Sequence, residues 1–365
     1  MKRIDLSKTS AKEVIAETCQ VLAAGGLVIF PTETVYGAGV DTTSQVAVTK
    51  LLAYKSRREG KPLSIAVATQ AMAEQYVELN DQARNLYQQF LPGPLTVVSK
   101  SLGKVAPGVE SEFGSLGVRI PDYLLLLDLI KAYGKPITAT SANASGKKRP
   151  YTVDDALNQL SVKQLALVDL ILDAGELPRN EPSAVIDTTL STPLTVRTGA
   201  LLTQLHLDQS AFISPSETET KAIAGKLILK HWNQVKRTGL VIGLDGSLGA
   251  GKTIFAKGVA QFLDIDEPIT SPTYTYLEEY AYDRSETVGV LHHLDLWKIN
   301  SESELRLLEI EKLVKPGNVI LVEWWSQVAE WLLPVIANKT APLLTVSIAD
   351  HPQGRSIAVK EPDEK

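Results

Sequence analysis

Hydrophobic and polar positions along this chain alternate in short segments that predict an α/β protein. Residues 10–24 have the apolar spacing of an amphipathic helix, and Ser10 followed by Glu13 forms a capping-box pattern at its start. Apolar runs typical of buried strands then recur with helical patterns between them. The predicted strands are 27–30, 63–68, 95–99, 116–120, 137–140, 170–173, 184–187 and 194–196. The intervening helices are predicted at 43–54, 71–75, 82–90 and 124–132.

The periodicity lapses at 206–220, where polar residues and a proline predict a linker that runs into a helix beginning near Ser216. We therefore expect an N-terminal domain at 1–205 and a C-terminal domain at 221–365. The pattern of the second domain predicts strands at 240–244, 273–277, 289–294 and 319–322, helices at 253–262 and 301–314, and a hairpin at the end.

Composition narrows the class of protein. A length of 365 residues suits two ordinary domains, and the single Cys19 excludes a disulfide framework or a cysteine-rich metal site within one chain. The first residues form no apolar leader and no apolar run is long enough to cross a membrane, so we expect a cytoplasmic protein without a membrane partner. Residues 206–365 carry 16 basic and 22 acidic side chains, a balance that disfavours nucleic-acid binding by this half.

A glycine-rich motif follows the predicted strand 240–244. Its backbone can curl around a phosphate, and a helix begins directly behind it. The motif comprises Gly246, Gly249, Ala250, Gly251, Lys252 and Thr253, a P-loop in which the lysine reaches the phosphates and the threonine hydroxyl ligates Mg²⁺. Residues 338–341 begin like a guanine-reading element but lack its acid, so we interpret them as a loop and favour ATP over GTP.

Two acidic residues end apolar runs in this half, Asp295 after 288–294 and Glu323 after 319–322. Carboxylates at strand ends beside a P-loop are placed where Mg²⁺ and the attacking water need them. We interpret both as candidate metal ligands.

The N-terminal half carries polar side chains where two predicted strands end, at 31–39 and 138–146. Lys55 and Arg57 lie between these segments in sequence and would point to the same side of an extended chain. Taken alone, these residues indicate an anion or nucleotide pocket and name no reaction.

At this point the motifs resemble a known family, the YrdC/Sua5 threonylcarbamoyl-AMP synthases. The resemblance covers about residues 10–205, in the family's order. It rests on Pro-Thr-Glu-Thr-Val-Tyr-Gly at 31–37, Lys55-x-Arg57, 92–96, 118–121, Ser141-x-Asn143, 182–187 and 197–199.

The resemblance implies a twisted mixed-sheet domain in which L-threonine, bicarbonate and ATP give threonylcarbamoyl-AMP and pyrophosphate. Lys55 and Arg57, with Mg²⁺, would offset the repulsion between carbamate and triphosphate, and Arg119 would bind the threonine carboxylate. The remaining implied contacts are Thr32, Thr34, Tyr36, Thr140 and Ser183 for the substrate, and Ser141, Asn143, Ser183 and Arg197 for the nucleotide.

The second half resembles the TsaE family, small P-loop ATPases of the same tRNA modification, over about residues 222–350. The similar motifs are 246–253, Ser271-Pro272-Thr273, His293-x-Asp295 and Glu323-Trp324. The resemblance implies Lys252 and Thr253 on the phosphates and metal, and Glu323 as a metal ligand. Asp295 would position water or metal, and Ser271 and Thr273 would sense the nucleotide. Trp297-Lys298 departs from the family's Tyr-Arg pair, and lysine does not reproduce the bidentate contact of arginine.

We therefore interpret the chain as a fusion of a synthase with an ATPase, using ATP at two sites and acting in N6-threonylcarbamoyladenosine formation. Proteins of the TsaB and TsaD type would supply the transferase step, and tRNA would be met through that complex. The alternative is a nucleotide-switched RNA-binding or assembly factor with an inactive synthase fold. A small-molecule kinase stays open for the second half, and Trp324 and Trp325 fit either a partner surface or core packing.

Overall fold

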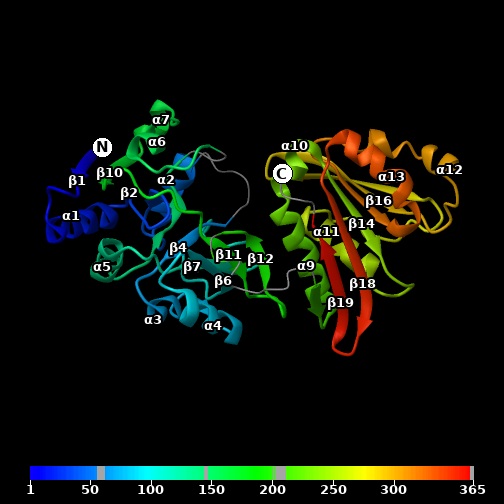
Figure 1. The fold of residues 1–365 in the computed structure, drawn as a ribbon, viewed down its shortest axis with the longest axis horizontal. Helices are drawn as coiled ribbons and strands as arrows, with labels where there is room; N and C mark the ends of the chain where they lie inside the picture. The colour runs from blue at the N-terminus through cyan, green and yellow to red at the C-terminus, as the bar shows by residue number, and fades with distance from the viewer. Residues whose placement is uncertain (56–61, 144–146, 200, 202–210, 362–365) are drawn as a thin grey trace. The chain divides into compact units, whose positions relative to one another are not determined.

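The computed structural model describes residues 1–55, 62–143, 147–199, 201 and 211–361 (Figure 1). These residues group into two compact units. One comprises Met1–Thr189 with Pro193–Leu207, and the other comprises Leu190–Thr192 with Asp208–Lys365. Among the described residues, none of the helices combines the length and apolar character that a membrane crossing requires.

The N-terminal unit contains two mixed sheets. The smaller has the strand order β1-β10-β2-β3-β9, parallel across its first three strands and antiparallel beyond β2. The larger has the order β12-β11-β6-β7-β4-β8, with β5 pairing β6. The strands are β1 Lys2–Asp5, β2 Leu27–Phe30, β3 Gly37–Gly39, β4 Ser64–Ala66, β5 Val77–Glu78, β6 Leu95–Ser101, β7 Ser115–Arg119, β8 Ile137–Thr138, β9 Thr140–Ser141, β10 Val168–Asp173, β11 Ala184–Asp187 and β12 Leu194–Arg197. The helices are α1 Ala11–Ala23, α2 Gln45–Lys55, α3 Gln70–Ala73, α4 Asp81–Phe90, α5 Leu124–Tyr133, α6 Val153–Leu157 and α7 Val162–Leu165.

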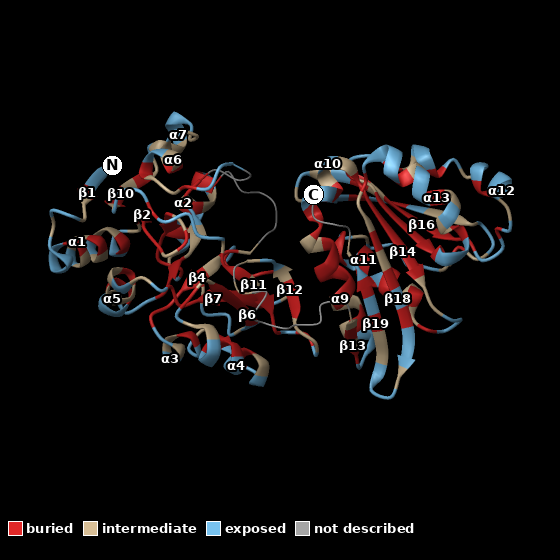
Figure 2. Ribbon diagram, viewed as in Figure 1, coloured by how far each residue is buried: buried red, intermediate tan, exposed pale blue. Residues whose placement is uncertain are grey.

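The expected α/β class and the capping box at Ser10 are confirmed: the Ser10 hydroxyl accepts from the Glu13 N–H, and the Glu13 carboxylate accepts from the Ser10 N–H. All four residues of β2 are buried, as the uninterrupted apolar run 27–30 predicts for a strand covered on both faces. Figure 2 shows the buried strands at the centre of each unit and the exposed surfaces on the helices.

The C-terminal unit is built on one seven-stranded sheet of order β13-β19-β18-β14-β17-β16-β15. Strand β14, which precedes the P-loop, pairs in parallel with β17 on one side and with β18 on the other. The elements are β13 Ala211–Ser214, α9 Glu217–Lys230, α10 Trp232–Thr238, β14 Leu240–Asp245, α11 Lys252–Phe262, β15 Leu277–Arg284, β16 Thr287–Asp295, α12 Glu302–Arg306, the 3₁₀ helix η1 Ile310–Lys312, β17 Val319–Glu323, α13 Trp325–Lys339, β18 Leu343–His351 and β19 Gly354–Lys360.

The structure corrects three expectations in this unit. Residues 273–276 form a turn and the strand begins only at Leu277, because its pairing with β16 starts there. The helix expected at 301–314 is split into α12 and η1 by Glu309, whose φ of 48° is incompatible with a continuous helix. Residues 338–339, expected in a loop, end helix α13.

Part of the segment expected to be a linker also has regular structure. Strand β13 pairs antiparallel with β19, and Ser216 caps α9 through its side chain. Residues 206–210 of that segment lie outside the described residues. Strand β13 lies among polar residues that hide it from a sequence pattern, and its pairing partner is more than 140 positions away.

Trp325 packs in the core and not on a partner surface. The side chain is 5 % exposed and covers Gly243 of β14. A Cβ at position 243 would overlap the Trp325 ring, so the strand requires glycine at this point.

We expect Gly243→Ala to lower the free energy of unfolding of the C-terminal unit by about 1–3 kcal/mol, because the indole must shift to admit the methyl group. Denaturant unfolding followed by tryptophan fluorescence measures this, since all five tryptophans lie in this unit. Ser347→Ala, at an exposed position of β18, is the matched control. Equal stability of the two variants would contradict the packing role of Gly243.

Candidate active sites

The segment 31–37 turns away from β2 through hydrogen bonds of one threonine. The Thr32 hydroxyl donates to the Val35 carbonyl at 2.7 Å and accepts from the N–H groups of Thr34 and Val35, both at 3.2 Å. It also lies 3.1 Å from the Thr34 hydroxyl. Both threonines are buried, so the turn presents a fixed polar surface at the end of the strand.

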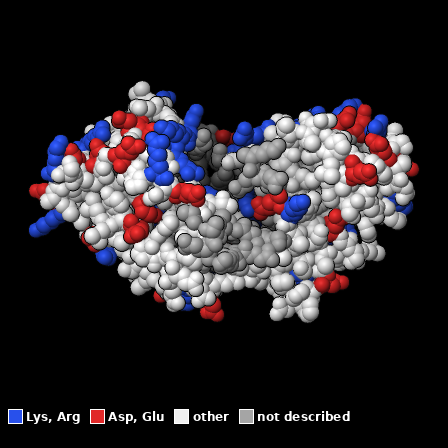
Figure 3. Space-filling model, viewed as in Figure 1, with Lys and Arg blue, Asp and Glu red and all other residues white. Residues whose placement is uncertain are grey.

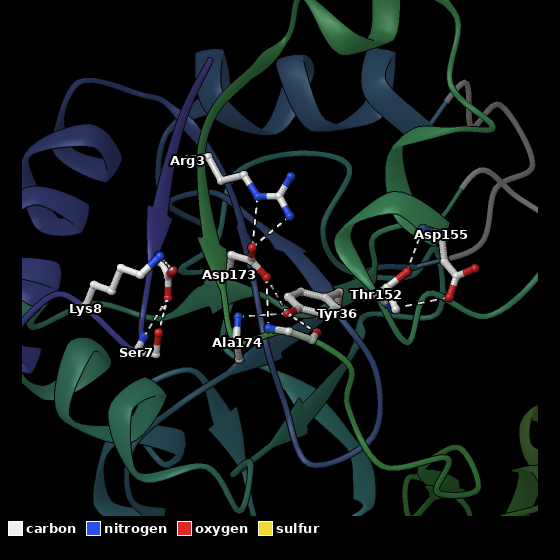
Figure 4. Close-up of polar contacts among 10 residues, drawn as sticks. Arg3, Ser7, Lys8, Tyr36, Thr152, Asp155, Asp173 and Ala174 are labelled. Atoms are coloured by element: carbon white, nitrogen blue, oxygen red, sulfur yellow. Dashed lines mark hydrogen bonds and ion pairs between the residues drawn. The ribbon is translucent and has the colours of Figure 1, made fainter.

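The Tyr36 hydroxyl joins this segment to the loop that follows β10 (Figure 4). Its hydroxyl donates to the Gly175 carbonyl at 2.8 Å and accepts from the Ala174 N–H at 2.9 Å, and Asp173 beside it pairs with Arg3. Burial raises the pKa of Tyr36 to about 12, which keeps the hydroxyl protonated. The side chain is fully buried and its hydroxyl contacts the loop that follows β10, so the expected role of Tyr36 in substrate binding stays a prediction.

Lys55 and the segment 141–143, which are more than 80 positions apart in sequence, meet in the structure. The Lys55 ammonium donates to the Ser141 carbonyl at 2.7 Å and to the Asn143 carbonyl at 2.5 Å. Tyr54 adds a hydrogen bond from its hydroxyl to the Ala142 carbonyl. Lys55 ends helix α2, so the condition of an extended chain is not met at this residue, and Arg57 lies outside the described residues.

Four buried polar atoms at this end of the unit lack a hydrogen-bond partner among the described residues. Glu33 and Arg119 form an ion pair, yet the second carboxylate oxygen of Glu33 and Nε of Arg119 are left unsatisfied. The Asn143 side-chain oxygen and the Ser183 hydroxyl are unsatisfied as well. Buried polar atoms normally have partners, and orphans gathered among residues of several motifs are typical of a ligand site.

Arg197 connects the last strand of the larger sheet to this group. Its Nε and Nη2 donate to the Ser183 carbonyl at 2.9 and 2.7 Å. Its side chain keeps an exposed surface, but enough protein surrounds the guanidinium that desolvation lowers its pKa. Arg119 and Arg149 lower that pKa further, because like charges disfavour one another. The arrangement concentrates positive charge suited to an anionic ligand.

Of the remaining N-terminal candidates, Thr140 and Ser141 form β9, which pairs antiparallel with β3 and holds the two polar segments side by side. Glu33, the one charged residue in the segment 31–37, was not among the residues predicted for the site. The place of this carboxylate within the motif was the sequence signal that could have identified it.

The P-loop of the C-terminal unit has the backbone that its sequence requires. Gly249 and Gly251 have φ values of 81° and 115°, a region that favours glycine. The Lys252 ammonium donates to the carbonyls of Gly246 and Ser247 at 2.8 and 3.1 Å and lies 4.3 Å from the centre of the Trp324 ring. Helix α11 begins at Lys252, so its first N–H groups face the loop.

The two acidic candidates lie side by side on neighbouring strands, because Asp295 of β16 is the register partner of Glu323 of β17. One oxygen of Asp295 accepts from the hydroxyls of Ser271 at 2.8 Å and Thr273 at 3.2 Å, while its other oxygen is buried and unsatisfied. Glu323 lies 2.9 Å from Nε2 of the fully buried His293. Hydrogen bonds from neighbouring side chains therefore hold both carboxylates in position.

These groups surround one cavity of about 700 Å³, large enough for a nucleotide. Its lining includes the predicted residues Gly249, Gly251, Lys252, Thr253, Ser271, Thr273, Asp295, Glu323 and Trp324, together with Trp297. Glu217 and Arg355 also line it, and no sequence motif had pointed to either of them.

The donor set fits Mg²⁺ as P-loop proteins hold it, with a hydroxyl, a carboxylate and phosphate oxygens. Thr253 would supply the hydroxyl, and Asp295 and Glu323, which also line the cavity, would supply the carboxylate. Within the described ranges, no group of three or more His, Cys, Asp or Glu side chains is arranged to hold a metal ion.

Family models match the two halves of the chain separately. The Sua5/YciO/YrdC family, described as "Telomere recombination", matches residues 20–199. The family described as "Threonylcarbamoyl adenosine biosynthesis protein TsaE" matches residues 214–357.

The relatives that match the first half include two threonylcarbamoyl-AMP synthases of bacteria. The threonylcarbamoyl-AMP synthase of Enterobacter sp. is 35 % identical over 148 residues, 40 % of this chain and 78 % of the relative. That of Photobacterium profundum is 32 % identical over 179 residues, 48 % of this chain and 97 % of the relative. The crystal structure of P. abyssi Sua5 complexed with L-threonine aligns with a TM-score of 0.51 at 21 % identity, covering 94 % of this chain and 99 % of that one, a likeness of fold. The chain therefore belongs to the Sua5/YciO/YrdC family through its N-terminal half and carries a TsaE-family domain in its C-terminal half.

Proposed function

We propose that the N-terminal unit makes threonylcarbamoyl-AMP and pyrophosphate from L-threonine, bicarbonate and ATP. The observation that carries this proposal is the meeting of Lys55 with the segment 141–143. The unsatisfied Nε of Arg119, side-chain oxygen of Asn143 and hydroxyl of Ser183 support it. Relatives that cover this half are named threonylcarbamoyl-AMP synthases, and the P. abyssi protein was crystallised with L-threonine.

The proposed chemistry brings anions together. The threonine amine and bicarbonate form a carbamate and water, and a carbamate oxygen then attacks the α-phosphorus of ATP while the bond to pyrophosphate breaks. Lys55, Arg119 and Arg197 place positive charge around these groups, and fixed charge of this kind stabilises the transition state. Arg57 is proposed for the same role from the sequence motif, as is Mg²⁺, which would shield the triphosphate.

We propose that the C-terminal unit binds and hydrolyses ATP in support of the transferase proteins of the TsaB and TsaD type. The P-loop cavity, the adjacent Asp295 and Glu323, and the match to the TsaE family support this assignment. Trp297 donates to the Thr273 carbonyl at 3.1 Å, and Lys298 lies 4.5 Å from the centre of the Trp297 ring. This exposed pair is where we expect partner coupling to differ from that of relatives with arginine.

The RNA-binding alternative receives no support from the charge pattern. On the face that Figure 3 shows, basic side chains gather at one place on the N-terminal unit with acidic groups directly beside them. Among the side chains coloured there, no continuous basic stripe runs across the unit, as strong phosphate-driven binding of RNA would require.

We expect Lys55→Ala to lower threonine-dependent pyrophosphate release by about 100-fold or more, because a fixed cation is removed where negative charge develops. The assay uses Mg-ATP and bicarbonate, with and without L-threonine, and separates pyrophosphate from orthophosphate. Lys252→Ala in the other unit should retain this release, as should Lys100→Ala, an exposed lysine paired with Glu78. Orthophosphate alone, insensitive to threonine, would contradict the synthase assignment.

Arg119→Gln is expected to raise the KM for L-threonine by roughly 10- to 100-fold while leaving the KM for ATP nearly unchanged, since it removes charged hydrogen bonds to the threonine carboxylate. Initial rates of pyrophosphate release at varied threonine and varied ATP separate the two constants. Arg84→Gln, an exposed arginine paired with Glu74, is the control. A rise confined to the KM for ATP would move Arg119 to the nucleotide.

For the C-terminal unit, Glu323→Gln should raise the Mg²⁺ concentration needed for ATP binding by about tenfold or more, the cost of losing one charge-assisted ligand interaction. ATP titrations at stepped Mg²⁺, followed by tryptophan fluorescence, report on this unit alone. Glu330→Gln changes an exposed glutamate of α13 and should have no effect. An unaltered Mg²⁺ requirement would remove Glu323 from the metal site.

A further inference from the structure

The strand order gives the P-loop two flanks with different chemistry. The loop leaves β14, and β17 and β16 on one side end in Glu323 and Asp295. On the other side of β14 lie β18, β19 and β13. We call the first the acidic flank and the second the hairpin flank.

Arg355 stands on the hairpin flank, more than 100 positions from the P-loop in sequence. Its Nε donates to the Ala250 carbonyl at 3.0 Å, and its side chain packs against Gly251 so closely that a Cβ there would lie 2.6 Å from Nε. The preceding Gly354 has a φ of 125° and meets the backbone of Ser214. The β18–β19 hairpin therefore holds the Arg355 side chain in contact with the P-loop.

Glu217 reaches the same flank from a third segment. Ser214 of β13 is the register partner of Arg355, and α9 begins three residues later with Glu217 as its first residue. Glu217 is exposed, yet it lines the same cavity as Arg355, Gly251 and Ile254. Neither Glu217 nor Arg355 belongs to the P-loop or to the acidic flank.

The direction of a bound nucleotide follows from these flanks. The terminal phosphate and its metal need Lys252, Thr253 and the carboxylates. The Lys252 ammonium lies 4.3 Å from the ring centre of Trp324, the residue after Glu323, so a terminal phosphate held by Lys252 lies toward the acidic flank. A nucleotide oriented in this way must extend its nucleoside past Gly251 toward the hairpin flank. A planar guanidinium stacks well on a base, and a carboxylate accepts hydrogen bonds from ribose hydroxyls.

We propose that Arg355 and Glu217 form the nucleoside subsite of the C-terminal unit, with the Arg355 guanidinium against the face of the base and the Glu217 carboxylate on a ribose hydroxyl. The inference rests on the proposed nucleotide binding of this unit and deepens it. Because every base offers a face for stacking, the subsite recognises a nucleoside as a class and adds little discrimination between bases.

The test compares ADP with inorganic pyrophosphate on the full chain in the presence of Mg²⁺. Tryptophan fluorescence follows this site selectively, because all five tryptophans lie in the C-terminal unit and Trp297 and Trp324 line the cavity. Arg355→Ala should weaken ADP about tenfold and leave pyrophosphate unchanged, since stacking involves only the nucleoside. Arg306→Ala, an exposed arginine of α12 paired with Glu302, should change neither.

Equal weakening of ADP and pyrophosphate by Arg355→Ala would overturn the proposal, because the arginine would then act on the phosphates or merely brace the loop. A wild-type chain whose tryptophan fluorescence responds to neither ligand would instead refute nucleotide binding by this unit altogether. The two failures are distinguishable because the second appears without any substitution.

Glu217→Ala supplies an independent check at an exposed position, where folding is not at risk. The wild type should prefer ADP to either 2′-deoxy-ADP or 3′-deoxy-ADP, and the variant should lose that preference, with its affinity for ADP falling to the level of the deoxy compound. Unchanged ratios between ADP and both deoxy compounds in the variant would remove Glu217 from the subsite.

Discussion

Two buried ammonium groups, those of Lys55 and Lys252, are held by backbone carbonyl oxygens in both halves of this chain. Burying a charge is costly unless polar groups surround it, and carbonyl dipoles offset part of that cost without adding a full negative charge. The carbonyl oxygens thus fix the position of each ammonium group. The segments that provide the carbonyls, 141–143 and 246–247, are therefore as much part of the sites as the lysines.

The two halves reach this arrangement by different routes. In the C-terminal unit the lysine and the carbonyls belong to one continuous motif, and a single strand-to-helix turn brings them together. In the N-terminal unit the lysine ends α2, and its carbonyls come from Ser141, the last residue of β9, and from Asn143 just after it. A site of this second kind exists only when both sheets have formed, because β3 pairs with β9 at one side and β4 with β8 at the other.

Much of the fold follows from the order of apolar runs, since a buried strand needs several consecutive apolar residues and a helix needs its caps. The failures occur where tertiary contacts outweigh local pattern. Glu309 interrupts an otherwise helical stretch in a left-handed conformation, β13 exists only through its pairing with β19, and residues 273–276 turn so that Ser271 and Thr273 reach Asp295. Local propensity contributes little to any of these.

By itself the sequence determined the P-loop, the acids at the ends of two strands, and the series of motifs shared with the synthase family, because each of these depends on neighbouring residues or on strand ends. Only the tertiary structure joined Tyr36 to the loop that follows β10, paired Glu33 with Arg119, and brought Arg355 to Gly251. Such contacts join positions separated by many tens of residues, and the free energy that selects them comes from packing and pairing of whole sheets. No local pattern of hydrophobic and polar residues encodes that free energy.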